Sequence, residues 1–127
     1  MMVVKMKQEK IAIASRPLAR VSRKDSVVLF KHIKNKPVRK AKTLLNELIE
    51  EKRSIKGRYF TKASGEILNL IKDCEANAEA KGLDTEKLFV KHAQTNKTFG
   101  FMLPKSRWTH RGRRAKICEL KLELEER

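Results

Sequence analysis

The chain has 127 residues, a length that suits one domain with a single modest core. Its 31 Lys and Arg residues against 15 Asp and Glu residues give a net charge of +16, and 40% of the residues are hydrophobic. Periodic apolar runs exclude a disordered tail, and no run approaches the roughly 20 apolar residues that cross a bilayer. The apolar patch after Met1 is too short for a signal peptide. We therefore expect a small intracellular protein with a polyanionic partner, most obviously nucleic acid.

The basic residues are concentrated in two zones. Residues 10–46 hold eleven basic side chains and one acid, Asp25, and residues 87–118 hold nine basic side chains and no acid. A surface that serves solubility alone intersperses the two signs and needs a net charge of only about 2–8. Both zones are therefore predicted to contact phosphate.

The first third of the chain predicts a strand and two helices. Lys10–Ala14 alternates as a short strand, and Pro17 is expected to end regular structure. Ser22 is expected to cap a first helix with Asp25 in its first turn. The apolar side of that helix consists of Val27, Leu29, Phe30 and Ile33.

A second helix is expected to follow after a short break. Asn35 can adopt the left-handed conformation that ends a helix, and Pro37 suits the opening of the next one, which continues to about Lys52. Ser54–Tyr59 is predicted to be a loop. The apolar positions of the second helix are Val38, Ala41, Leu45, Leu48 and Ile49.

A third, longer helix is predicted from Thr61, as its cap, to Gly82, a residue suited to the left-handed position after a helix. Cys74 lies on its apolar stripe and is interpreted as a small buried hydrophobic residue. Since neither Cys74 nor Cys118 belongs to a CxxC pair, a disulfide framework and a zinc module are both disfavoured. The stripe consists of Ala63, Ile67, Leu70, Ile71, Cys74 and Ala78.

The last third predicts two strands joined by a long arm. Leu88–Ala93 and Ile117–Leu124 are expected to pair antiparallel and to enclose the 23 residues of Gln94–Lys116. Ordinary hairpin loops have two to five residues. If Gln94–Leu103 stays extended, the arm reaches about 33 Å from the body, at ~3.3 Å per residue.

The tip of the arm carries the chemistry expected of an RNA contact. Lys105–Arg114 places five Lys or Arg side chains around the single tryptophan, Trp108. Arginine matches phosphate oxygens and stacks on bases, and an exposed Trp stacks on unpaired bases. RNA contact is therefore favoured over a place in the core. For Phe99, Phe101 and Met102, packing within the arm and contact with RNA are equal alternatives.

The sequence contains no catalytic or metal-binding signature. His32, His92 and His110 share no metal-ligand spacing with one another or with either cysteine. There is no glycine-rich phosphate loop, nucleophile elbow or HExxH motif. We expect no enzymatic activity, no metal and no cofactor.

Several motifs together resemble a known family. Ala19–Lys24 and Pro37–Ala41 resemble the opening of the universal large-subunit ribosomal protein twenty-two, which is protein seventeen in the eukaryotic count. Gly57–Ser64, followed by Cys74–Asp84, is similar to the archaeal and eukaryotic branch. His92–Lys97 stands where that family enters its extended hairpin. The resemblance runs from about residue 19 to residue 125.

The resemblance implies an α+β fold of three helices packed on a small three-stranded antiparallel sheet, with a long protruding β-hairpin arm. It implies one domain over 1–127, with a globular body at about 10–93 and 115–125 and an RNA-binding hairpin at about 94–116.

The implied function is that of a structural constituent of the large ribosomal subunit in the cytoplasm. Such a protein binds 23S-type rRNA across several RNA domains and contacts neighbouring large-subunit ribosomal proteins. It also aids assembly, and its hairpin lines the exit tunnel for the nascent polypeptide. The family implies no membrane association and no small-molecule substrate. The alternative from another class is a free-standing architectural protein that binds DNA or RNA.

Two features depart from the family. The longer insertion that usually precedes the Gly-Arg-Tyr motif is missing before Gly57, and the tip reads Met102–Thr109 in place of a Pro-Arg-Ala-x-Gly-Arg pattern. The residues expected to bind RNA are Arg16, Arg20, Arg23, Lys24, Lys34, Lys36, Arg39, Arg58, Lys62, Lys97, Lys105, Arg107, Trp108, His110, Arg111, Arg113, Arg114 and Lys116.

Overall fold

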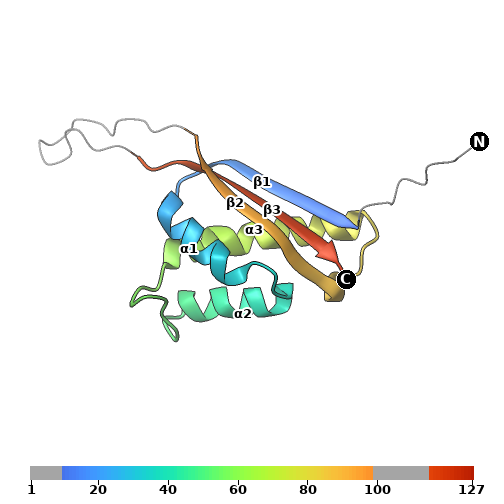
Figure 1. The fold of residues 1–127 in the computed structure, drawn as a ribbon, viewed down its shortest axis with the longest axis horizontal. Helices are drawn as coiled ribbons and strands as arrows, with labels where there is room; N and C mark the ends of the chain where they lie inside the picture. Colours follow the sequence, from blue (N-terminus) through green and yellow to red (C-terminus); the bar gives the residue numbers. More distant parts are fainter. Residues whose placement is uncertain (1–9, 99–114) are drawn as a thin grey trace, which may run out of the picture.

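The structure is a computed structural model that describes residues 10–98 and 115–127 (Figure 1). Strand β3 (Cys118–Glu126) is the central strand of its sheet. It pairs antiparallel with β1 (Ile11–Ala19) on one side and with β2 (Leu88–Lys97) on the other, in the order β1-β3-β2. The helices α1 (Arg23–Ile33), α2 (Val38–Ile49) and α3 (Thr61–Ala80) lie on one side of this sheet, and a short 3-10 helix, η1 (Thr85–Lys87), precedes β2. The predicted α+β fold is confirmed. The predicted arm falls largely on 99–114, outside the described residues.

The alternation predicted for the last strand forms one wall of the core. Cys118, Leu120, Leu122 and Leu124 are fully buried, while Glu119, Lys121 and Glu123 between them are partly exposed. The ladder of β2 and β3 continues to the pair Lys97↔Cys118. Residues 94–97, which were predicted to belong to the arm, therefore lie in the same sheet as the body.

The prediction that Pro17 ends regular structure is wrong. β1 continues through Pro17 to Ala19, with a register shift between Arg16 and Ala19. Pro is tolerated there because β1 is an edge strand, where a missing N–H removes no hydrogen bond from a central ladder. The outer edge of β1 is partly covered by α3, since Asn77 Nδ2 donates to the Ile13 carbonyl oxygen at 2.9 Å.

The helices begin and end near the predicted residues, but neither predicted side-chain cap forms. Ser22 is the N-cap of α1 without a side-chain capping bond. Thr61 is the first residue of α3, and its N-cap is Phe60, in the left-handed conformation with φ 47°. α2 ends at Ile49, earlier than the predicted Lys52.

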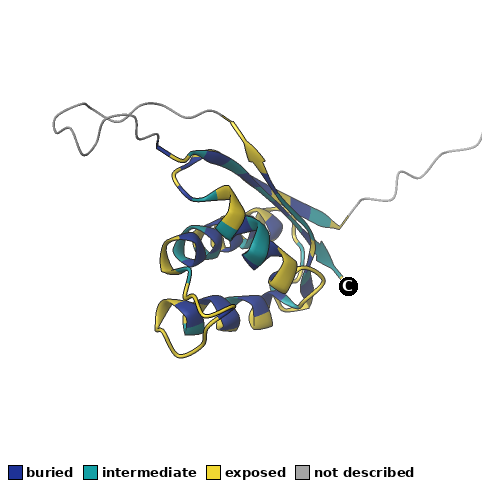
Figure 2. Cartoon of the chain, turned by 60° about the vertical axis from the view of Figure 1, so that its left-hand side comes forward, coloured by how far each residue is buried: buried dark blue, intermediate teal, exposed yellow. Residues whose placement is uncertain are grey.

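The predicted apolar stripes form the core, with three corrections. Every predicted position of the third helix is buried, whereas Val27 of α1 is only partly buried and Ile49 of α2 is 37% exposed. Leu44 replaces Ile49 because it lies on the side of α2 that faces α3 and the sheet. Figure 2 shows the buried residues on the surfaces where helices and sheet meet. Cys74 is buried as predicted, and its Sγ donates to the Ala12 carbonyl oxygen at 3.2 Å.

Left-handed conformations occur at several of the turns between elements. Asn35, with φ 62°, ends α1 as predicted. Gly82, with φ 76°, follows α3 as predicted, and the Leu83 N–H returns to the Ala78 carbonyl oxygen at 3.0 Å, which completes a Schellman motif. In the predicted loop, Ile55 and Arg58 exchange two backbone hydrogen bonds around a two-residue turn. That turn lies within the connection between α2 and α3, residues 50–60.

Within residues 10–98 and 115–127, no helix combines the length and apolar character needed to cross a membrane.

Candidate nucleic-acid interface

Six of the predicted RNA-binding side chains gather at one end of the body. The end of β1, the starts of α1 and α3, the end of β2 and the start of β3 lie together there, on the left in Figure 1. All six side chains are exposed. We call this surface the basic end; its members are Arg20, Arg23, Lys24, Lys62, Lys97 and Lys116.

The cations of the basic end outnumber the acids around them. None of its six cations forms an ion pair with a described residue. Asp25 and Glu119 are acids in the same region, and Glu66 is already paired with Arg16. Crowded like charges raise the local positive potential, which attracts a polyanion and raises its association rate.

A second group of predicted residues lies on the turn between α1 and α2. Lys34 and Lys36 are exposed on this turn, and Arg39 is exposed in the first turn of α2 that follows it. The turn is fixed to the sheet by two backbone hydrogen bonds, from Asn35 N to the Val90 carbonyl oxygen at 2.9 Å and from Val90 N to the Lys36 carbonyl oxygen at 3.0 Å. These cations therefore stand on ordered backbone, which reduces the entropy lost when they bind.

Arg16 differs from the other predicted residues because its charge is already satisfied. Its guanidinium donates to Glu66 Oε2 at 2.9 Å and to Asp73 Oδ2 at 3.2 Å, and these contacts fasten β1 to α3. Arg58, in contrast, stands exposed on the two-residue turn before α3.

The remaining predicted residues lie outside the described residues. They are Lys105, Arg107, Trp108, His110, Arg111, Arg113 and Arg114, together with Phe99, Phe101 and Met102 of the open alternatives.

The described residues offer no cluster that would suit a metal or a nucleophile. No group of three or more His, Cys, Asp or Glu side chains within residues 10–98 and 115–127 is arranged to hold a metal ion. His32 is exposed, and His92 Nε2 lies 3.0 Å from Gln94 Oε1. Burial raises the pKa of the Cys74 thiol to about 11, so this group stays protonated at neutral pH.

The sequence did not predict that three of these cations line one pocket. A pocket of about 340 Å³ brings Arg20, Lys62 and Lys116 together with Asp25. These residues are up to 96 positions apart in the chain, so no local pattern could have joined them. The sequence signal was the excess of basic over acidic residues in 10–46 and 87–118.

The opposite end of the body carries four cations, and three of them form ion pairs. Lys10 lies 3.7 Å from Glu126, Lys87 lies 4.0 Å from Asp84 and Arg127 lies 3.5 Å from Glu125. We call this surface the opposite end; its cations are Lys10, Lys81, Lys87 and Arg127. Lys81 Nζ donates to the Ile11 carbonyl oxygen at 2.9 Å.

The fold and this charge distribution define a class: a small α+β domain with one unpaired basic end suited to a polyanion. The family model described as "Ribosomal protein L22p/L17e" matches residues 14–122. The chain belongs to this family, as the resemblance predicted.

The curated relatives it matches carry the name "Large ribosomal subunit protein uL22". The one from Archaeoglobus fulgidus is 34% identical over 96 residues, covering 61% of this chain and 62% of the relative. The one from Methanocella arvoryzae is 36% identical over 96 residues, covering 61% and 63%. The one from Methanococcus maripaludis is 42% identical over 83 residues, covering 65% and 48%.

The match spans less than two thirds of the length of these relatives. In the Archaeoglobus fulgidus alignment, 61% of 127 residues is about 77 residues, against an alignment length of 96. About 19 aligned positions therefore have no counterpart in this chain, the difference between 96 and 77.

Proposed function

We propose that this chain is a structural constituent of the large ribosomal subunit that binds its rRNA through the basic end and the α1–α2 turn. The observation that carries the proposal is the family match over residues 14–122, joined to a surface of six cations without ion partners among the described residues. Phosphate is the group that such a surface recognises in RNA.

The role we propose is architectural, without catalysis or a small-molecule substrate. The partners are large-subunit rRNA of the 23S type and neighbouring large-subunit ribosomal proteins, and the location is the cytoplasmic ribosome. The chain is one domain, in which the body docks and residues 94–116 extend into the subunit. Arg16 is set apart within this proposal, since its two carboxylate partners favour a role in holding β1 against α3.

We also propose that the hairpin borders the exit tunnel and meets the nascent polypeptide. The support is the family membership, together with the antiparallel β2–β3 ladder that continues to Lys97↔Cys118 and so brings the two ends of the intervening segment together. Deletion of residues 104–113 should leave incorporation into large subunits intact and change the stalling of particular nascent chains. Loss of incorporation would contradict this division of roles.

The test of rRNA binding is a salt titration of the purified chain with a large-subunit rRNA transcript. With about 6–10 phosphates engaged, the slope of log affinity against log salt should lie between about −4 and −9. A slope near −1 or −2 would show that few phosphates are bound. The class of complex is tested by sedimentation from cells: the tagged chain should travel with large subunits through a high-salt wash, whereas a free-standing architectural protein would travel with DNA.

A further inference from the structure

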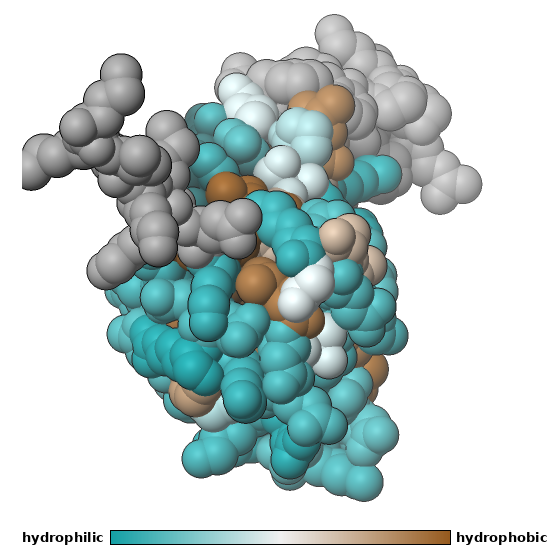
Figure 3. Space-filling view, turned by 90° about the vertical axis from the view of Figure 1, so that its right-hand side faces the viewer, coloured by the Kyte–Doolittle hydropathy of each residue, from teal (hydrophilic) through white to brown (hydrophobic). Residues whose placement is uncertain are grey.

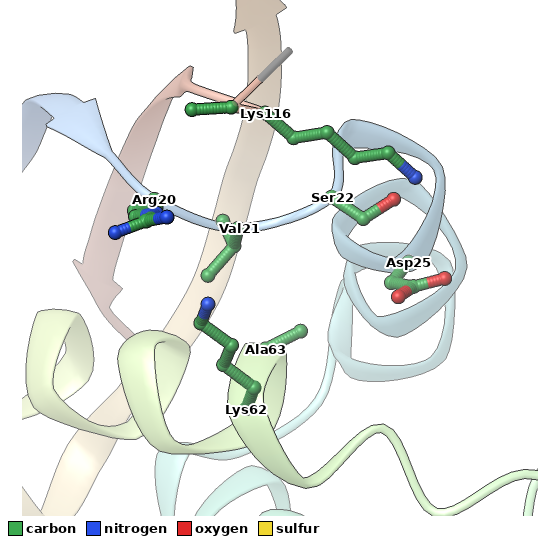
Figure 4. A pocket seen from close by; sticks show the side chains of 8 residues that line it. Arg20, Val21, Ser22, Asp25, Lys62, Ala63 and Lys116 are labelled. Carbon is green, nitrogen blue, oxygen red and sulfur yellow. The ribbon is translucent and has the colours of Figure 1, made fainter. Parts of the chain in front are cut away.

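The pocket at the basic end lies between three parts of the chain that are far apart in sequence. One wall is the segment that joins β1 to α1, another is the first turn of α3, and the third is the segment just before β3. Its volume is about 340 Å³. In Figure 4 the Lys62 side chain rises from α3 toward Val21, beside Arg20, and Lys116 reaches across toward the start of α1.

The lining of this pocket is strongly positive. Arg20, Lys62 and Lys116 contribute three positive charges, and Asp25 contributes the single negative one. None of the three cations forms an ion pair with a described residue. Arg20, Lys62 and Lys116 line one hollow from three separate segments, so an anion that enters it offsets their mutual repulsion. Guanidinium and ammonium groups bind phosphate through charge-assisted hydrogen bonds.

Two helices begin at the same pocket, and both lack side-chain caps. Ser22, the N-cap of α1, lines the pocket, and neither it nor Phe60, the N-cap of α3, accepts a bond from a helix N–H through its side chain. The first N–H groups of a helix have no partner within the helix, and the helix dipole favours an anion near them. An anion in the pocket would meet both helix starts as well as the three cations.

We infer that this pocket binds one phosphate group of the rRNA backbone, shared by Arg20, Lys62 and Lys116. The inference rests on the proposed function and makes it more specific, because it assigns the three cations to one phosphate group rather than to three separate phosphate groups. A phosphate held there joins the start of α1, the start of α3 and the segment that enters β3. It therefore fixes the base of the hairpin to the body when the rRNA is bound.

The first experiment measures the salt dependence of rRNA binding by the full chain and its variants. The triple variant R20Q/K62Q/K116Q should bind an rRNA transcript at least about 10-fold more weakly at moderate salt, and its log–log slope should be shallower by about 0.7–0.9, the value for one phosphate. The matched control is Lys72→Gln, an exposed lysine on the same helix about 15 Å further along α3, which should change affinity less than 2-fold.

The second experiment removes the one acid of the pocket. Asp25→Asn should strengthen rRNA binding by about 2–5-fold, because the carboxylate that repels the phosphate is replaced by a neutral amide. Its matched control is Glu79→Gln, an exposed acid on α3 outside the pocket, which should have a clearly smaller effect. Circular dichroism and thermal unfolding of each variant verify that the fold is retained.

A third experiment distinguishes a phosphate of the RNA backbone from free inorganic phosphate. Inorganic phosphate, titrated at constant ionic strength, should shift the backbone amide signals of residues 22–25 and 61–63 in the millimolar range, and rRNA should shift the same signals. If inorganic phosphate shifts them and rRNA does not, the ligand is a free phosphate and the assignment to RNA is overturned.

The remaining outcomes separate this inference from the proposed function. If the unaltered chain binds rRNA with a steep salt slope but the triple variant behaves like Lys72→Gln, the pocket assignment alone is wrong. A slope that becomes shallower by about 2–3 in the triple variant would show three separate phosphates, which also overturns it. If the unaltered chain binds rRNA without a steep slope, the proposed function fails together with the inference.

Discussion

Both ends of the body carry several cations, but the two ends differ in how many of those cations form ion pairs. At the opposite end, Lys10, Lys87 and Arg127 each lie within 4.0 Å of a carboxylate. At the basic end, six cations form no ion pair with a described residue. Figure 3 looks onto the opposite end, where hydrophilic side chains surround a small hydrophobic group. Net charge therefore identifies a class of partner, whereas the lack of ion pairs among the described residues indicates which surface meets that partner.

Reversing charge at the two ends should give the largest contrast. The triple variant R20E/K62E/K116E should lose rRNA affinity by about 1,000-fold, because each reversal costs on the order of 1.4 kcal/mol through a lost phosphate contact and new repulsion. The matched variant K10E/K81E/K87E, at the opposite end, should lose less than about 10-fold. Filter binding at one salt concentration measures both, and equal losses would mean that only total charge matters.

Stability should depend on the core between the two ends and not on the basic end. Leu122→Ala, in the fully buried centre of β3, should lower the free energy of unfolding by about 2–5 kcal/mol. Neutralising Arg20, Lys62 and Lys116 together should change it by less than about 1 kcal/mol, since these side chains are exposed and have no ion partners among the described residues. Urea unfolding of both variants provides the comparison. A large loss from the neutralised variant would place these cations in the fold rather than in the interface.

The buried thiol of Cys74, between sheet and α3, should make stability fall at alkaline pH. Burial raises the pKa of this thiol to about 11, while an unfolded chain leaves it near 9. The folded state therefore holds its proton more tightly, and the stabilisation is complete below pH 9 and lost as the pH rises toward 11. The loss should reach about 2 kcal/mol and should be smaller in Cys74→Ala, as measured by urea unfolding at pH 8, 9.5 and 10.5. Identical pH profiles would show that the thiol is not buried in the folded chain.

Arg16 and Arg20, four residues apart, should separate packing from binding. Arg16→Gln removes the contacts with Glu66 and Asp73 and should lower the free energy of unfolding by about 1 kcal/mol, with rRNA affinity nearly unchanged. Arg20→Gln should do the reverse, with unchanged stability and an affinity about 3–10-fold lower. Thermal unfolding and filter binding on the same two variants test this. A larger affinity loss from Arg16→Gln would reverse the assignment.

Local signals in the sequence predicted most of the fold. Asn35 and Gly82 have left-handed conformations that follow from their chemistry, and the alternation of Cys118–Leu124 fixed the inward face of β3. The errors arose where tertiary structure overrides local preference. Pro17 continues a strand because that strand lies at an edge. The N-cap of α3 is Phe60 rather than Thr61, in a left-handed conformation that an aromatic residue does not signal in a sequence. Each cation of the basic end was predicted individually as an RNA contact. Their position around one pocket was not, because it depends on packing between segments that are far apart in the sequence.

The most direct test of the account is the reactivity of individual lysines in purified large subunits, compared with the free chain. An amine-specific reagent, read by mass spectrometry, reports each lysine at both ends of one molecule. Because the basic end faces the rRNA in the assembled subunit, Lys24, Lys62, Lys97 and Lys116 should lose reactivity on assembly. Lys10, Lys81 and Lys87 should keep most of theirs. Protection of the opposite end with a reactive basic end, or equal protection of both, would contradict it.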